Sequence, residues 1–80
     1  MAAENGESAQ EVARRIEDRL ARAGLTRRDL AARTGIPFAT VNRKLDAPHE
    51  LTFAELHLIA ASLGTTPLAF IPSGDRAAQP

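Results

Sequence analysis

Few side chains of this sequence could perform catalysis or bind a metal. His49 and His57 are the only histidines, and there is no cysteine. A metal site would need both histidines together with carboxylates, but one lies in a predicted loop and the other on a predicted helix. No Ser-His-Asp set, glycine-rich phosphate loop or pair of catalytic carboxylates stands out. We therefore expect no cofactor, no metal, no small-molecule ligand and no enzymatic activity.

The basic residues suggest a different chemistry, the binding of a polyanion. Nine of the ten lysines and arginines lie between residues 13 and 45, together with only three acidic residues. This stretch carries a net charge of +6 and the rest of the chain −6, so the formal total is zero. Such asymmetry indicates a nucleic-acid partner, and the alternative is a set of solvated helix faces. On the first predicted helix we expect mainly ion pairs of Arg14, Arg15, Arg19 and Arg22 with Glu11, Glu17 and Asp18.

The size and composition are those of one small globular domain, with 80 residues, 44% of them hydrophobic and 25% charged. No apolar run approaches the roughly 18 residues of a membrane span. The first ten residues are polar and acidic, unlike the basic and then apolar start of a secretory signal. We expect a cytoplasmic protein with no membrane partner.

Helical periodicity and capping signals predict an all-α fold. The pairs Ser8–Glu11, Thr26–Asp29 and Thr52–Glu55 have the spacing of capping boxes, which begin helices. Residues 1–7 and 72–80 are expected to be disordered, which leaves one domain over residues 8–71. The expected helices cover about 9–23, a second from Thr26 to Gly35, a third over about 38–45, a fourth from Thr52 to Gly64 and a short fifth with Leu68, Phe70 and Ile71. Phe53, Leu56, Ile59, Ala60 and Leu63 carry the apolar period of the fourth.

The second and third predicted helices form the most specific feature. Both are short, and Gly35 and Ile36 lie between them, before Pro37. Small residues at the crossing, Ala31 and Gly35, would let the two helices meet at a steep angle. This is the arrangement of a helix-turn-helix, here at about 27–45, in which the second helix enters the major groove of DNA.

The segment Leu25–Leu45, LTRRDLAARTGIPFATVNRKL, resembles the helix-turn-helix of the lambda repressor and Cro superfamily. Leu51–Gly64 is similar to the fourth helix of that superfamily. The resemblance covers roughly residues 9–71 and implies five helices, binding to duplex DNA and control of transcription in a bacterial cell or a phage-infected host. The sequence departs from the family pattern in three places. Pro37 stands in place of a capping Ser, Asp46-Ala47 in place of Asn-Gly, and Phe38 at the start of the recognition helix.

Carried over residue by residue, the resemblance assigns DNA contacts to both helices of the motif. It implies that Asn42 bonds adenine, that Arg43 reads guanine, and that Phe38 or Ala39 packs on thymine methyl groups. For Phe38 the alternative is packing against the core, for Arg43 it is a phosphate contact or a solvated charge, and for Asn42 it is an exposed polar residue without a DNA contact. The implied base contacts are Phe38, Ala39, Asn42, Arg43 and Arg27, and the implied backbone contacts are Thr26, Arg28, Thr40 and Lys44.

Apolar residues outside the main core pattern indicate a second surface. Leu58, Leu68, Phe70 and Ile71 are possible contacts of a homodimer, which would read a palindromic operator with half-sites about 34 Å apart. The alternative for Phe70 and Ile71 is closure of the core of the domain. We expect a sequence-specific repressor of the Cro or repressor type. The alternative function is a protein-interaction module on the same fold, such as an antitoxin or an inhibitor of another regulator.

Overall fold

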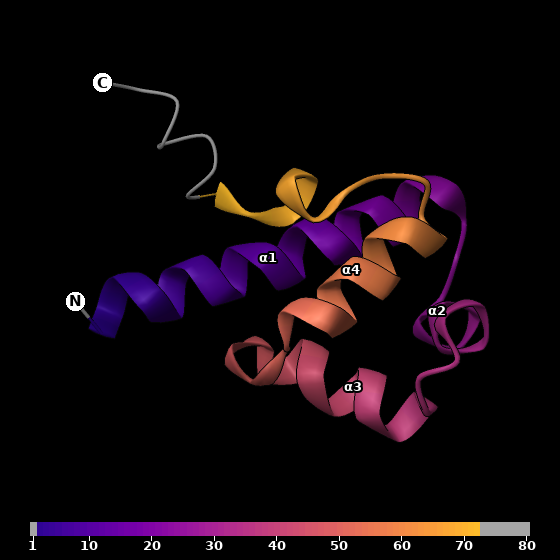
Figure 1. Ribbon diagram of the computed structural model, residues 1–80, viewed down its shortest axis with the longest axis horizontal. Coiled ribbons are helices and arrows are strands. Elements are labelled where there is room, and N and C mark those ends of the chain that lie inside the picture. The colour runs from indigo at the N-terminus through magenta and orange to yellow at the C-terminus, as the bar shows by residue number, and fades with distance from the viewer. Residues whose placement is uncertain (1, 73–80) are drawn as a thin grey trace.

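The computed structural model describes residues 2–72, which contain helices and no strand. Four α-helices and two short 3-10 helices are arranged so that α3 and the C-terminal segment lie on opposite sides of α4 (Figure 1). The predicted all-α class is confirmed. Within these residues, no helix is both long and apolar enough to cross a membrane. The elements are α1 (Ala2–Ala23), α2 (Arg27–Thr34), α3 (Phe38–Asp46), η1 (Pro48–Glu50), α4 (Phe53–Ser62) and η2 (Pro67–Phe70).

The first helix begins earlier than the sequence predicted. α1 starts at Ala2, so Ser8 lies inside the helix and the predicted start at a Ser8–Glu11 capping box is wrong. Residues 2–7 contain no proline, and their alanines and glutamates favour the start of a helix although Asn5 and Gly6 do not. Part of the segment that we expected to be disordered is therefore helical. Residues 73–80 of the predicted tail lie outside the described residues.

The two other capping boxes are confirmed. The amide of Asp29 donates to Thr26 Oγ1 at 3.1 Å and the amide of Thr26 to Asp29 Oδ2 at 2.8 Å. The corresponding distances for Thr52 and Glu55 are 3.1 and 2.9 Å. Each box satisfies two amides that the first turn of a helix would leave without partners. α2 and α4 therefore begin where the sequence predicted.

The core is formed by one apolar side of each helix together with η2. Its largest fully buried side chains are Ile16, Leu30, Ile59 and Phe70, from α1, α2, α4 and η2. The predicted fifth helix is a single 3-10 turn that begins with Pro67. Phe70 is 1% exposed, so it closes the core and cannot contribute to a dimer surface. Ile71 also packs against the core and is half-buried.

Removal of the Phe70 ring is expected to destabilise the domain strongly. Phe70→Ala should lower the free energy of unfolding by about 3–5 kcal/mol, because the cavity opens between η2 and α1. Urea denaturation followed by circular dichroism measures the change. The control is Leu68→Ala in the same turn, where a side chain that is 66% exposed is removed. Its effect should be within about 0.5 kcal/mol, and equal losses for both variants would contradict the assignment of Phe70 to the core.

Candidate nucleic-acid interface

α2 and α3 form a helix-turn-helix at one side of the molecule (Figure 1). Gly35 ends α2 with φ of 79°, a left-handed conformation that glycine adopts without a steric penalty. α3 buries Val41 and Leu45 and exposes Ala39, Asn42, Arg43 and Asp46. Pro37 is the N-cap of α3 and makes no side-chain cap, as the sequence predicted. One side of α3 therefore packs inward and the opposite side is exposed.

Arg27, the first residue of α2, is held by carboxylates from two other helices. Its Nε and Nη2 donate to Glu17 Oε2 of α1 at 2.8 and 2.5 Å. Its Nη1 donates to Asn42 Oδ1 at 2.6 Å and to Asp46 Oδ1 at 3.1 Å, both on α3. Partial burial of the guanidinium opposes its charge, but the hydrogen bonds to Glu17 and Asp46 outweigh this effect and raise the pKa of Arg27. Arg27 thus links the three helices around the motif.

The two basic residues at the end of α3 are also paired with carboxylates. Arg43 forms an ion pair with Glu50 of η1, and both side chains are largely exposed. Lys44 Nζ donates to the two carboxylate oxygens of Glu55 at 2.8 and 2.7 Å, and this pair is mostly buried. The hydrogen bond from Lys44, followed by that from the Thr52 amide, lowers the pKa of Glu55. Lys44 therefore fastens α3 to the start of α4.

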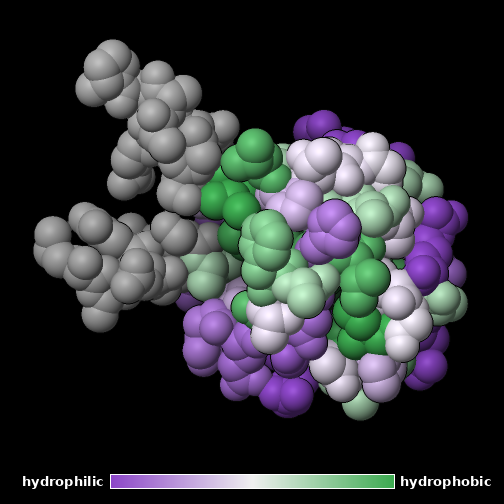
Figure 2. Space-filling view, viewed as in Figure 1, coloured by the Kyte–Doolittle hydropathy of each residue, from purple (hydrophilic) through white to green (hydrophobic). Residues whose placement is uncertain are grey.

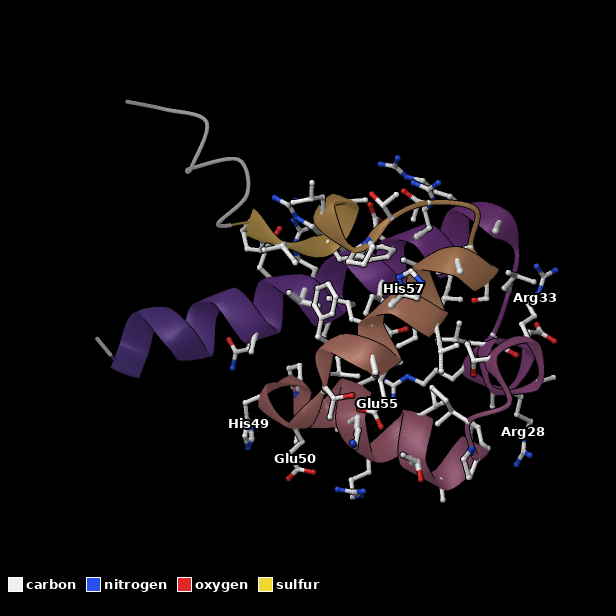
Figure 3. The ribbon with its side chains drawn as sticks, viewed as in Figure 1. Arg28, Arg33, His49, Glu50, Glu55 and His57 are labelled. Atoms are coloured by element: carbon white, nitrogen blue, oxygen red, sulfur yellow. The ribbon has the colours of Figure 1, made fainter. Side chains whose placement is uncertain are left out.

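The N-terminal part of α2 presents a cation that lies against an aromatic ring. The guanidinium carbon of Arg28 is 4.2 Å from the centroid of the Phe38 ring, which is within the range of a cation–π contact. Phe38 is half-buried and packs against the core. This agrees with the alternative prediction for Phe38, in which the ring faces the core and not the DNA. Arg28 and Arg33 both extend outward from α2 (Figure 3). Thr26 is exposed and Thr40 is half-buried.

Residues 15–68 match the family model of the Cro/C1-type HTH DNA-binding domain. This match extends from α1 into η2 and includes the whole motif. The protein belongs to the Cro/C1-type HTH DNA-binding domain family. The predicted superfamily is therefore confirmed. No curated protein and no solved structure matches the chain.

The basic surface of this Cro/C1-type domain is more neutral than its sequence suggested. Arg27, Arg43 and Lys44 each lie against a carboxylate, so their charges are partly compensated. Local patterns in the sequence do not predict these pairs, because the partners are 7 to 11 residues apart in the chain. Of the expected pairs on α1, those of Arg14 and Arg15 with Glu11 and of Arg22 with Asp18 are present. Glu17, which was expected to pair within α1, pairs with Arg27 of α2 instead. Hydrogen bonds from Arg14 and then Arg15 lower the pKa of Glu11 to about 2.

The outward side of α4 in the Cro/C1-type domain is largely apolar. Leu58 is 46% exposed and Leu68 of η2 is 66% exposed, as expected for two of the proposed dimer contacts. Phe53 is 69% exposed, although its place in the apolar period suggested an inward position. Phe53 directly follows the N-cap Thr52. The first residue of α4 lies at the edge of the side that packs against the core, and this position in the sequence indicates exposure.

The described residues hold no cluster of three side chains suited to a metal ion. His49 lies on η1 and His57 on α4, well apart in the view of Figure 3.

Loss of the Glu55 carboxylate should change both stability and its pH dependence. Because the folded state lowers the pKa of Glu55 from its ordinary value of 4.5, this group stabilises the fold above about pH 4.5. The contribution disappears as the pH falls through the lowered folded value. Glu55→Gln should therefore reduce the free energy of unfolding by about 1 kcal/mol at pH 7, and the difference from the unchanged protein should vanish in acid.

Urea denaturation between pH 2.5 and pH 7 tests this expectation. The control is Asp18→Asn, which removes an exposed carboxylate paired with Arg22 at 3.3 Å. Exposed pairs of this kind contribute about 0–1 kcal/mol, so its profile should follow that of the unchanged protein. A difference for Glu55→Gln that stays constant across the pH range would contradict the assigned role of the carboxylate.

Proposed function

We propose that this protein is a sequence-specific transcriptional repressor that inserts α3 into the major groove of an operator. The observation that carries the proposal is the exposed side of α3, where Ala39, Asn42 and Arg43 lie opposite the buried Val41 and Leu45. A helix fits the major groove, and these side-chain types suit base edges. Occupation of an operator would exclude RNA polymerase, so repression is the simplest consequence of binding.

The contacts divide into those that read bases and those that hold the backbone. Asn42 and Arg43 would donate to base edges, and Ala39 would lie against a thymine methyl group. Thr26 and Arg28, at the N-terminus of α2, together with Thr40, would contact phosphates, where the helix dipole also favours an anion. Phosphate contacts orient the domain and the α3 side chains select the sequence.

Lys44 and Phe38 have structural roles that reduce their part in binding. The Lys44 ammonium group is engaged by Glu55 and only 15% of its side chain is exposed. The Phe38 ring packs against the core and supports Arg28. We therefore include neither the expected backbone contact of Lys44 nor the expected base contact of Phe38 in the proposal.

Selection from a random duplex library, followed by sequencing of the bound DNA, tests the proposed function. An enriched motif is expected, and Arg43→Ala should lower affinity for it by about 1–3 kcal/mol and relax one base position. The control is Arg22→Ala, which removes an arginine paired with Asp18 beside η2, away from α3. Its affinity should be unchanged. The absence of any motif would overturn the proposal and favour the protein-interaction module.

We further propose that two copies of the chain pair through the outward side of α4. The exposed residues Phe53, Ala54, His57, Leu58 and Ala61 lie along this side and carry no Asp, Glu, Lys or Arg. Two such faces can meet without repulsion between like charges. Green, apolar surface lies over α4 and beside the C-terminal segment, with hydrophilic side chains between (Figure 2). A homodimer would present two copies of α3 to a palindromic site.

Sedimentation equilibrium measures this association. The unchanged protein is expected to show a monomer–dimer equilibrium, which Leu58→Lys should shift to monomer, because each interface would bury two ammonium groups. The control is Ala21→Lys, which adds the same charge at an exposed position of α1. A monomer at all concentrations, or equal effects of the two variants, would exclude the α4 interface.

A further inference from the structure

Asn42 lies in the exposed side of α3, and the orientation of its amide is determined by Arg27. Nη1 of Arg27 donates to Asn42 Oδ1 at 2.6 Å and to the Asn42 main-chain oxygen at 3.3 Å. A guanidinium group carries only donors, so the amide must turn its oxygen, and not its nitrogen, toward Arg27. The two N–H groups of Nδ2 are then directed away from Arg27, and no residue described in the structure accepts from them.

Arg27 itself is fixed before any DNA arrives. Its Nε and Nη2 each donate to Glu17 Oε2, at 2.8 and 2.5 Å, and Nη1 also reaches Asp46 at 3.1 Å. Only 27% of its side chain is exposed. The side chain is therefore anchored on α1 and α3 at once, and the hydrogen bond to Asn42 belongs to a preformed network.

The charge around Asn42 disfavours a phosphate at this place. The single guanidinium of Arg27 lies between two carboxylates, those of Glu17 and Asp46. The group of three carries a net charge of −1. A phosphate oxygen beside Asn42 would meet this charge, whereas a base edge is neutral. Asn42 is therefore placed to meet a base.

We propose that Arg27 is a positioning residue that makes Asn42 a donor toward the major groove, so that Asn42 selects guanine and disfavours adenine. This inference rests on the proposed function, since it assumes that α3 enters the groove. Guanine presents two acceptors there, O6 and N7, which match the two N–H groups of Nδ2. The adenine pairing that the family resemblance implied requires Oδ1 to accept a second hydrogen bond, from adenine N6, beside the donor that Arg27 already places on it.

The test is selection from a random duplex library with the unchanged protein and three variants. The unchanged protein should select guanine at one position of its motif, and Asn42→Ala should reduce the preference there by about tenfold, the value of one good side-chain–base pair. Asn42→Asp keeps an acceptor for Arg27 and turns an oxygen outward in place of the amino group. Its preference at that position should change to cytosine, which presents the N4 donor. Arg27→Ala releases Oδ1 and should allow adenine.

Several outcomes would overturn the inference. Selection of adenine by the unchanged protein at the position that Asn42→Ala relaxes would show that Oδ1 faces the DNA. A guanine preference unaffected by Asn42→Asp would show that another residue reads that base. If Arg27→Ala fails to fold, as judged by circular dichroism, Asn42→Asp still decides the question because it retains the Arg27 contact. The absence of any motif for the unchanged protein would overturn the proposed function itself, together with this inference.

Discussion

α3 has a narrow apolar attachment to the rest of the domain. Val41 and Leu45 are buried and Phe38 packs against the core from the first turn, and these few apolar side chains determine the rotation of the helix only in part. Charged hydrogen bonds supply the remaining constraints. Arg27 holds Asn42 and Asp46 from the side of α2, and Lys44 reaches Glu55 at the start of α4. The direction in which α3 presents its side chains therefore depends on ion pairs as much as on the core.

The same ion pairs govern how the domain meets a polyanion. The carboxylate of Glu50 beside Arg43 partly compensates the charge of the guanidinium and so weakens its long-range attraction for a polyanion. The exposed pair can exchange partners at low cost, since surface pairs contribute little. The mostly buried Lys44–Glu55 pair is costly to break. The domain thus combines an exchangeable ion pair at its surface with a fixed one below it.

Local signals in the sequence predicted local structure well, while contacts between distant residues could not be read from it. The boxes at Thr26 and Thr52 were predictable because each joins residues three positions apart. The end of α2 at Gly35 follows from one residue type. The extension of α1 to Ala2 was missed because a capping pattern at Ser8 also occurs inside a continuous helix. The burial of Phe70 and the partners of Arg27 depend on how the helices pack, which no local pattern encodes.

The position of Phe70 has a consequence for where the unit of folding ends. The match to the Cro/C1-type family covers residues 15–68, yet Phe70 lies beyond it and is as deeply buried as Ile16. Ala13, just before the matched segment, is also buried. A fragment trimmed to the matched residues would lose part of its own interior at both ends. The segment that defines the family is therefore shorter than the segment that folds, and any dissection or fusion of this domain has to keep the flanking turns.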